Sequence, residues 1–166
     1  IAEIIKVIND FEPDWLYLQN SILYVFIYAA DKLGLNFPNS IKYIEYIGEP
    51  LCSYYREKIE KMISVPSSSM YGCVETNGMA FECEYGHDHL VSDNTYVEIV
   101  DRDGNVKKDG ETGYVCTTGL HNTAMPILRY RLNDLASIDR ETNCSCGNKN
   151  PIIHIKAARM PEFLIL

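Results

Sequence analysis

The sequence predicts an α/β protein in which a partial layer of parallel sheet and helices is followed by a small antiparallel, barrel-like β subdomain. Two observations carry this prediction. Strand-like and helical hydrophobic periods alternate through residues 1–78, whereas short alternating runs separated by turn residues follow from Met79. Short connections between strand, helix and strand imply right-handed crossovers, and therefore parallel pairing, in the first part. We expect an α/β subdomain at 1–78 and a β subdomain at 79–156.

The first part begins with a helix, a strand and a second helix. Residues 1–11 (IAEIIKVINDF) have helical spacing, and residues 14–18 (DWLYL) are typical of a short strand. We expect Ser21 to cap the next helix, which would end at Gly34. The predicted apolar face of this helix consists of Ile22, Val25, Phe26, Ala29 and Leu33.

The same alternation continues through the rest of the first part. Residues 41–47 (IKYIEYI) predict a second strand, and Pro50 is expected to open a helix that reaches about Ile63. A third strand is predicted near 67–71, ending at Gly72. Three parallel strands would leave both sheet edges unpaired. We therefore expect a natural protein that begins further upstream, and association of the isolated fragment, for example as a homodimer.

Turn residues divide the second part into short strand-like runs. The turn Asp103–Gly104 separates two of them, and such a series is typical of an antiparallel meander or small barrel. The predicted strands are residues 79–83 (MAFEC), 95–101 (TYVEIVD), 113–119 (GYVCTTG), 125–131 (MPILRYR) and 135–139 (LASID).

Composition and charge narrow the classes of function. Of the 166 residues, 46% are hydrophobic and 23% charged, which is the balance of a globular protein rather than a disordered one. The net charge of −8 leaves no basic stripe, so we expect a small-molecule partner, with no nucleic acid and no membrane. The longest apolar run, residues 22–30, is about half the ~20 residues that cross a bilayer, and no signal peptide opens the chain. This predicts a cytoplasmic protein.

The cysteine pattern suits a metal better than disulfides. Of the six cysteines, Cys144 and Cys146 are separated by a single residue, and a glycine follows the second. Cys83, His87 and His89 form a second group. Thiolate and imidazole are the ligands of structural zinc, and a glycine permits the tight turn that such a site needs. We expect structural zinc bound by both groups; unlinked thiols and imidazoles on loops are the alternative.

Two loops of the first part are candidates for binding a ligand, because ligands of parallel α/β sheets bind beyond the carboxyl ends of the strands. These loops are 48–50 (GEP) and 71–75 (YGCVE). The second combines an aromatic ring for stacking, a glycine for close approach of the backbone and a carboxylate for a cation. The alternative is that the glycines serve turns and the glutamates are solvated.

A further candidate lies in the segment MPILRYRLND, where Arg129, Arg131 and Asp134 surround a predicted strand. An arginine fork next to a carboxylate could hold a phosphate and a sugar diol. An ion pair on the surface of an edge strand is the alternative.

These segments, in this order, resemble the adenylate-forming ligase superfamily, and within it the phenylacetate–coenzyme A ligase family with its capsule-biosynthesis (CapK-type) relatives. The combination of YGCVE with HNTAMPILRYRLND is specific, and nearly the whole chain is covered. The matching stretches are YIGEPL, YGCVETNGMAFEC, GHDHLVSDNTYVEIVD, GETGYVCTTGLHNTAMPILRYRLNDL, CSCG and KAARMPEF. The resemblance implies a fragment that spans the end of the large N-terminal domain, with a hinge to a missing C-terminal domain at 157–166.

The resemblance also implies an activity. Enzymes of this kind convert a carboxylic acid and ATP into an acyl-adenylate and then transfer the acyl group to a thiol. We therefore expect ATP or AMP, magnesium, coenzyme A and structural zinc as cofactors, and a small carboxylic acid as the substrate. The chain contains no glycine- and serine-rich phosphate loop and ends before the adenylation lysine, so we expect the fragment alone to be inactive.

The functional positions of the family map onto this chain by motif. Tyr71 would stack on adenine with Gly72 beside it, Glu75 would be the catalytic carboxylate on the magnesium side, and Asp134 would grip the ribose hydroxyls. Arg159 would lie near the nucleotide at the hinge. The adenine and acyl pocket would be lined by Gly48, Glu49 and Pro50, and the zinc ligands would be Cys83, His89, Cys144 and Cys146.

Three positions depart from the family pattern. Val74 stands where a hydroxyl near the phosphate is usual, Ala158 replaces a glycine, and Pro161 fixes φ where the hinge is expected to rotate. These departures favour an alternative function, in which a degenerate homologue acts as a non-catalytic binding protein in capsular polysaccharide biosynthesis.

Overall fold

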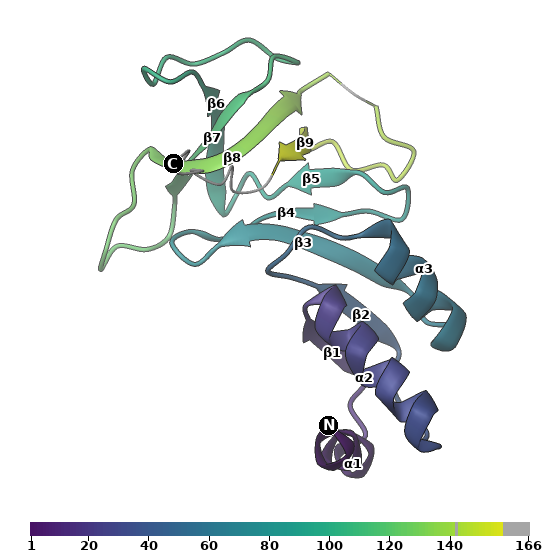
Figure 1. Cartoon of the computed structure of the whole chain (residues 1–166). Helices are drawn as coiled ribbons and strands as arrows, with labels where there is room; N and C mark the ends of the chain where they lie inside the picture. Colours follow the sequence, from purple (N-terminus) through teal and green to yellow (C-terminus); the bar gives the residue numbers. More distant parts are fainter. Residues whose placement is uncertain (142, 158–166) are drawn as a thin grey trace, which may run out of the picture. The chain divides into compact units, whose positions relative to one another are not determined.

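The computed structural model describes residues 1–141 and 143–157 (Figure 1). The chain divides into two compact units, Ile1–Ser69 and Met70–Leu166. The first is built from helices and parallel strands and the second from antiparallel strands, so the predicted fold class is confirmed. No helix in the described part is long and apolar enough to cross a membrane.

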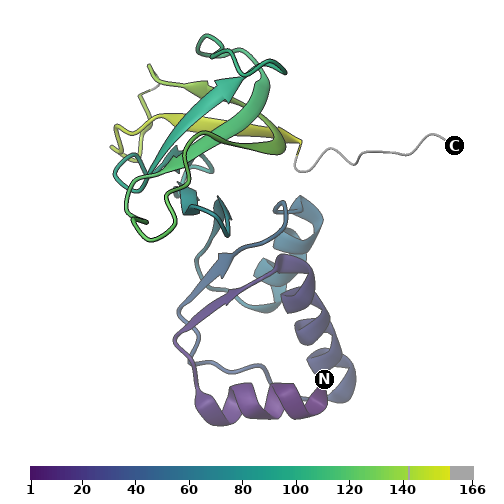
Figure 2. The ribbon, with the colours of Figure 1, turned by 90° about the vertical axis from the view of Figure 1, so that its left-hand side faces the viewer.

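The first unit alternates helices with strands (Figures 1 and 2). Its elements are α1 (Ala2–Phe11), β1 (Trp15–Leu18), α2 (Asn20–Leu33), β2 (Tyr43–Tyr46), α3 (Ser53–Met62) and the start of β3 (Ser67–Cys73). Strand β2 pairs in parallel with β1 and with the first residues of β3, in the registers Trp15↔Tyr43 and Ile44↔Ser67. The predicted parallel pairing is therefore correct. Helix α3 starts at Ser53, later than the predicted start at Pro50.

The core of the first unit lies where α2 and α3 pack on the strands. Leu23 of α2, Ile44 of β2 and Ile59 of α3 are almost completely buried. Burial of such a side chain contributes about 1.5–3 kcal/mol, so these contacts stabilise the layer of helices on the sheet. The buried cluster consists of Leu23, Ile27, Ile41, Ile44, Tyr46 and Ile59.

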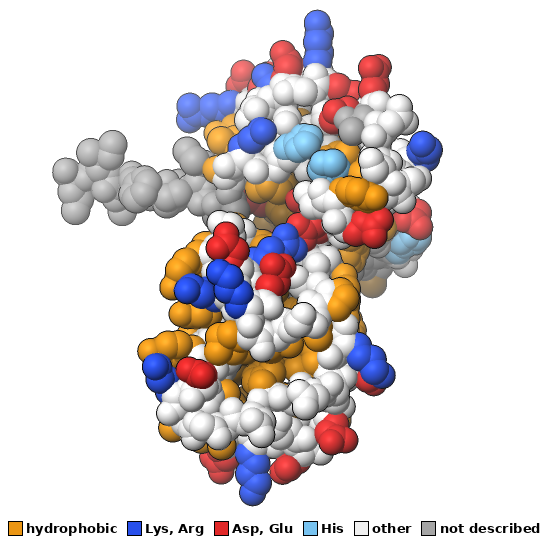
Figure 3. All heavy atoms as spheres, turned by 90° about the vertical axis from the view of Figure 1, so that its right-hand side faces the viewer, with side chains coloured by type: hydrophobic (Ala, Val, Ile, Leu, Met, Phe, Trp, Pro, Cys, Tyr) orange, Lys and Arg blue, Asp and Glu red, His pale blue; other side chains and the backbone are white. Residues whose placement is uncertain are grey.

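Helix α2 buries a different face from the predicted one. Leu23, Ile27 and Ala30 are buried, whereas Ile22 and Leu33, predicted for the core, are 40% and 56% exposed. The helix is apolar on two faces, so its period alone did not determine which face meets the sheet. Hydrophobic side chains are accordingly visible on the surface of the first unit (Figure 3).

The start of α2 also differs from the prediction. Gln19, not Ser21, occupies the N-cap position, and no side chain of α2 caps the helix. Glu49 provides the missing partner, since its Oε1 accepts the backbone N–H of Ser21 at 2.7 Å. The Asn20 side-chain amide donates to the carbonyl oxygen of Pro50 at 3.2 Å. A carboxylate at a helix N-terminus satisfies an unpaired N–H and interacts favourably with the helix dipole. The loop after β2 therefore fixes the start of α2.

The second unit contains antiparallel pairs in the order β3-β4-β5-β9-β8-β7-β6. Its further strands are β4 (Asn77–Glu82), β5 (Asp88–Leu90), β6 (Thr95–Val100), β7 (Gly113–Gly119), β8 (Tyr130–Asp139) and β9 (Ile152–Ala157). The predicted start of this unit, near Met79, lies inside β4. The division falls earlier, after Ser69, because β4 forms a hairpin with the second half of β3.

The strands around β8 account for the other differences from the prediction. Residues 125–129 of the predicted strand 125–131 lie outside β8, which starts only at Tyr130, directly after Arg129 with its left-handed φ of 48°. From there it continues through the predicted strand 135–139 as one element. Strands β5 and β9 were not predicted. They pair with each other, and β9 also pairs with β8.

The buried face of α2 can be tested by two neighbouring substitutions in this chain. Leu23→Ala should lower the free energy of unfolding by about 2–5 kcal/mol, because it leaves a cavity at a fully buried position. The control Ile22→Ala, on the exposed side, should change it by no more than about 0.5 kcal/mol. Urea unfolding followed by the helical circular dichroism signal measures both. Equal losses would contradict the buried face that the structure assigns to α2.

Candidate functional site

Four side chains of the metal-binding type gather in the second unit. The ligand atoms of Cys83, His89, Cys144 and Cys146 all lie within 4.8 Å of one another, and these are the four residues that the resemblance selected. Cys83 follows β4, His89 lies in β5, and the other two lie between β8 and β9. Pairing of β5 with β9, which joins His89 to Ile152, brings the two sequence groups together.

Two backbone turns present the cysteines. The N–H of Gly86 donates to the carbonyl oxygen of Cys83 at 2.8 Å, and the N–H of Gly147 donates to that of Cys144 at 3.1 Å. Both glycines have left-handed φ angles, of 75° and 82°. A residue with a Cβ adopts this conformation only with strain, so glycine fits both turns.

The distances within the cluster fit a tetrahedral zinc site. The sulfur atoms of Cys83 and Cys144 are 3.8 Å apart, and Cys146 Sγ is 3.4 Å from His89 Nε2. Four ligands about 2.3 Å from a central zinc ion lie roughly 3.8 Å from one another. The second ring nitrogen of His89, Nδ1, lies 3.0 Å from the carbonyl oxygen of Asn150. This contact orients the ring with Nε2 toward the sulfur atoms, as is usual for histidine ligands.

The thiols of the cluster also favour a cation. Burial raises the pKa of Cys83, but hydrogen bonds from the backbone of His87 and Tyr85 and from neighbouring side chains outweigh this and lower the pKa to about 7. The Cys146 backbone lowers the pKa of Cys144, yet burial and the adjacent thiols raise it overall. Thiolates this close repel one another unless a metal compensates their charge. His87 stands outside the set of four, with its Nδ1 3.3 Å from Cys144 Sγ.

Two of the predicted nucleotide-binding residues are in direct contact. The Tyr71 hydroxyl at the end of β3 donates a hydrogen bond to Asp134 Oδ2 in β8 at 2.8 Å. Burial, followed by the hydrogen bond to Asp134, strongly raises the pKa of Tyr71. The hydroxyl therefore stays protonated and remains a donor, while the Asp134 carboxylate, 9% exposed, is oriented by it.

Glu75 contacts the same strand, β8, by a hydrogen bond with Tyr130, a residue that was not among the predicted site residues. A hydrogen bond to Glu75, followed by the charge of that carboxylate, raises the pKa of Tyr130 at the start of β8. The structure thus joins two predicted residues to β8 at different positions: Tyr71 bonds to Asp134 and Glu75 bonds to Tyr130. The RYR motif was interpreted through its arginines alone, although its central tyrosine carries the contact.

The arginines of that motif lie away from Asp134. Tyr71, which donates to Asp134, packs against the core of the second unit, whereas the cross-strand partner of Arg131 is Cys116 of β7. Arg131 donates to the carbonyl oxygen of Arg102. These contacts do not support the shared phosphate-and-diol site for Arg131 and Asp134 that the sequence suggests.

The predicted glycines and the first loop have structural contacts of their own. A Cβ at Gly72 would lie 2.4 Å from the carbonyl oxygen of Asn77, so the β3–β4 hairpin requires a glycine there. Gly48 has a φ of 74°, and Glu49 and Pro50 bond to the start of α2 within the first unit. Arg159 lies outside the described residues, as do Ala158 and Pro161.

The curated proteins to which this chain is similar include several phenylacetate-coenzyme A ligases. No family model matches the chain. It is 31% identical to a phenylacetate-coenzyme A ligase of Aromatoleum evansii over 140 residues, which is 81% of this chain and 32% of that protein. It is 28% identical to a phenylacetate-coenzyme A ligase of Thermus thermophilus, over 98% of this chain and 38% of that protein. The chain therefore spans about a third of the length of these relatives.

Solved structures agree in fold. A crystal structure of 2-hydroxyisobutyryl-CoA ligase in complex with an acyl-AMP has a TM-score of 0.78 and 22% identity, and the match covers 91% of this chain and 33% of that one. An anthranilate CoA ligase in complex with anthranoyl-AMP has a TM-score of 0.68 and 16% identity, covering 93% of this chain and 31% of that one. The predicted relationship is confirmed: this chain is a relative of the phenylacetate–coenzyme A ligases, shares its fold with solved CoA ligases, and corresponds to about a third of such a protein.

Proposed function

We propose that this chain is a segment of an ATP-dependent carboxylate–coenzyme A ligase, in which it contributes residues that bind the nucleotide. The observation that carries the proposal is the hydrogen bond of Tyr71 to Asp134, together with the bond of Glu75 to Tyr130 in the same strand. A ring, a ribose-binding carboxylate and a cation-binding carboxylate are thereby gathered within one unit. The relatives support this choice because their names describe ligation to coenzyme A.

Each of these residues has a role that its chemistry fits. Asp134 would accept hydrogen bonds from the two ribose hydroxyls, since a carboxylate offers acceptor sites on both oxygens. The ring of Tyr71 would lie against adenine while its hydroxyl orients Asp134. Glu75 would bind magnesium, which prefers hard oxygen ligands.

Together these residues would position the reactants for adenylation. The carboxylate of the substrate attacks the α-phosphorus of ATP, and pyrophosphate leaves in line with the attack. Such a reaction depends on holding the nucleotide, the cation and the acid in register and on compensating the charge that develops. The residues of this chain would fix the nucleoside end. We propose that the longer protein binds the carboxylic acid and uses coenzyme A as the acceptor.

We also propose that Cys83, His89, Cys144 and Cys146 bind a structural zinc ion. Four thiolate and imidazole ligands complete a tetrahedron, which leaves no position for a catalytic water. The ion would tie the β4–β5 hairpin to the segment between β8 and β9. Since binding of such an ion is part of the free energy of folding, its role would be to stabilise the second unit.

One observation favours a second candidate function, that of a non-catalytic binding protein in surface-polysaccharide assembly. Val74, next to Glu75, has an apolar side chain that is 96% exposed and that cannot donate a hydrogen bond to a phosphate. An adenylation assay with a panel of carboxylic acids separates the two functions. Turnover with any acid would remove the second candidate.

The role of Asp134 is tested by pyrophosphate exchange in a full-length ligase that carries this chain. Asp134→Ala should reduce exchange by at least about 100-fold, because it removes two charge-assisted hydrogen bonds to the ribose. Asp93→Ala, which changes an exposed carboxylate elsewhere in the second unit, is the matched control and should keep full exchange. Unchanged exchange in Asp134→Ala would refute the assigned role.

The positioning role of Tyr71 is tested by Tyr71→Phe, which keeps the ring and removes the hydroxyl. Because Asp134 loses its donor, the KM for ATP should rise roughly tenfold, with a smaller change in kcat. The preference for ATP over 2′-deoxy-ATP should fall in parallel, since the ribose contact is weakened. Equal changes for both nucleotides would show that the hydroxyl does not act through the ribose-binding carboxylate.

The zinc site is tested by metal analysis of this chain, purified without chelators. The wild-type chain should contain about one zinc ion, and Cys144→Ser should contain roughly a tenth of that or less. Cys52→Ser, which changes an exposed cysteine outside the cluster, should retain the metal. Chelation should lower the melting temperature of the wild-type chain, because the bound ion stabilises the folded state. A wild-type chain without metal would contradict the proposal.

A further inference from the structure

A cavity of about 210 Å³ opens on the face of β6, β7 and β8 opposite to the core of the second unit. Its lining includes the buried side chains of Val100 and Cys116 and three arginines, Arg102, Arg129 and Arg131. We call it the arginine pocket. Strand pairing places the pocket residues on this face of the sheet: Glu98 of β6 lies opposite Cys116 of β7, and Cys116 lies opposite Arg131 of β8.

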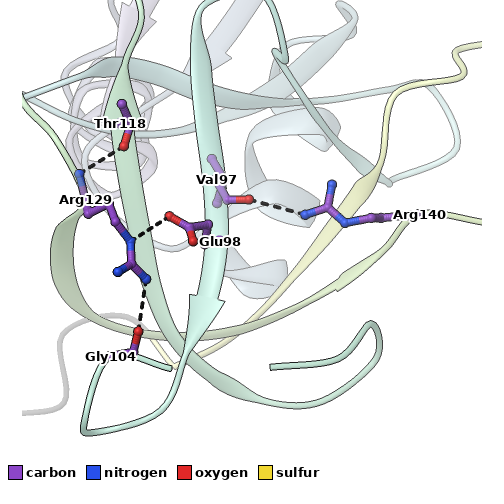
Figure 4. A network of polar contacts seen from close by, with 6 residues as sticks. All are labelled: Val97, Glu98, Gly104, Thr118, Arg129 and Arg140. Atoms are coloured by element: carbon purple, nitrogen blue, oxygen red, sulfur yellow. Dashed lines mark hydrogen bonds and ion pairs between the residues drawn. The ribbon is translucent and has the colours of Figure 1, made fainter. Parts of the chain in front are cut away.

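Arg129 is held in the arginine pocket by three polar contacts (Figure 4). Its backbone N–H donates to Thr118 Oγ1 at 2.9 Å, and its backbone has a left-handed φ of 48°. Its Nε forms an ion pair with Glu98 Oε2 at 3.1 Å, and its Nη2 donates to the carbonyl oxygen of Gly104 at 2.9 Å. A left-handed arginine is an uncommon backbone state that the surrounding structure must maintain, and such states concentrate at functional sites.

Arg131 and Arg102 complete the pocket. Arg131 Nη1 donates to the carbonyl oxygen of Arg102 at 2.7 Å, and its guanidinium carbon lies 5.2 Å from the centre of the Tyr114 ring. Stacking on a ring and one backbone contact fix the plane of the guanidinium before any ligand binds. A guanidinium has five N–H donors. Among the described residues, hydrogen bonds use only one donor of Arg131 and none of the Arg102 side chain.

The pocket carries a positive charge on a negatively charged protein. The lining contains three arginines and one carboxylate, Asp103, so the lining is positive although the chain carries −8. Two nearby carboxylates are already engaged: Glu98 pairs with Arg129, and Asp101 accepts N–H groups of Asp103 and Asn105. Planar guanidinium groups match the oxygens of a phosphoryl group in a bidentate arrangement. The volume suits a group smaller than a whole nucleotide.

We propose that the arginine pocket binds a phosphoryl group, either as inorganic phosphate or as the terminal phosphate of a larger ligand. The site is separate from the proposed nucleotide-binding residues, because Asp134 bonds to Tyr71 on the core side of the second unit and neither residue lines the arginine pocket. It does not depend on the proposed ligase function. Loss of pyrophosphate exchange in Asp134→Ala should therefore leave phosphoryl binding at the arginine pocket intact.

The test is a titration of this chain, labelled for amide NMR, with three probes: inorganic phosphate, adenosine 3′,5′-bisphosphate, and adenosine, which has no phosphate. The first two should cause saturable shifts of the amides at 102–104, 116 and 129–131, and adenosine should not. Tighter binding of the bisphosphate would support a ligand-borne phosphate, and equal binding of both would support free phosphate. Absence of saturable shifts with both phosphate probes would overturn the proposal.

Variants assign the binding to the arginines. Arg131→Gln and Arg102→Gln should each weaken phosphate binding by about tenfold, because each removes a charge-assisted contact. Arg102 has no side-chain contact among the described residues, so Arg102→Gln keeps the test valid if Arg131→Gln fails to fold. The matched control is Arg140→Gln, since Arg140 pairs with Asp109 outside the pocket and donates to Val97 (Figure 4). Equal weakening in the control would overturn the assignment.

Discussion

The pairing of β8 with β7 and β9 is the constraint on which the sites of the second unit depend. This pairing places Tyr130 and Asp134 where they contact Glu75 and Tyr71, and it places Arg131 across from Cys116. The register of β8 against β7 changes between Arg131 and Leu135, so this irregular pairing is part of the constraint. Strand β8 therefore positions both the contacts of Asp134 and Glu75 with tyrosines and the arginine pocket.

The cysteine cluster depends on the other partner of β8. Strand β9 pairs with both β8 and β5, so the two groups of ligands, distant in sequence, are joined by strands whose core residues Ile138 and Ile153 are buried. The hydrogen bond of His89 to Asn150 and the glycine turns then determine the directions of the donor atoms. In such an arrangement the sheet brings the ligands near one another, and short-range backbone geometry sets the distances that a tetrahedral ion requires.

The first unit shows how a polar residue near a strand end can serve the fold. Glu49 follows β2, where a ligand loop was expected, and in this unit its carboxylate accepts an N–H at the start of α2. The helix has no capping side chain of its own, so a residue distant in sequence takes that part. Glycine at position 48 supports the same turn through its left-handed φ. The hydrogen bond from Ser21 to Glu49 and the turn at Gly48 give residues 48–50 a structural role in this unit.

The sequence by itself determined the order of the main elements and the two Cys/His groups, because hydrophobic periods, turn glycines and motif spacing are local properties of the chain. The resemblance to the ligases, also read from the sequence, selected the four metal ligands. Tertiary structure decided what depends on partners. The buried face of α2 was chosen by packing, since both faces are apolar, and β5 and β9 form because each has a strand to pair with. The contact of Tyr130 with Glu75 and the separation of Arg131 from Asp134 required the register of β8, which no single segment encodes.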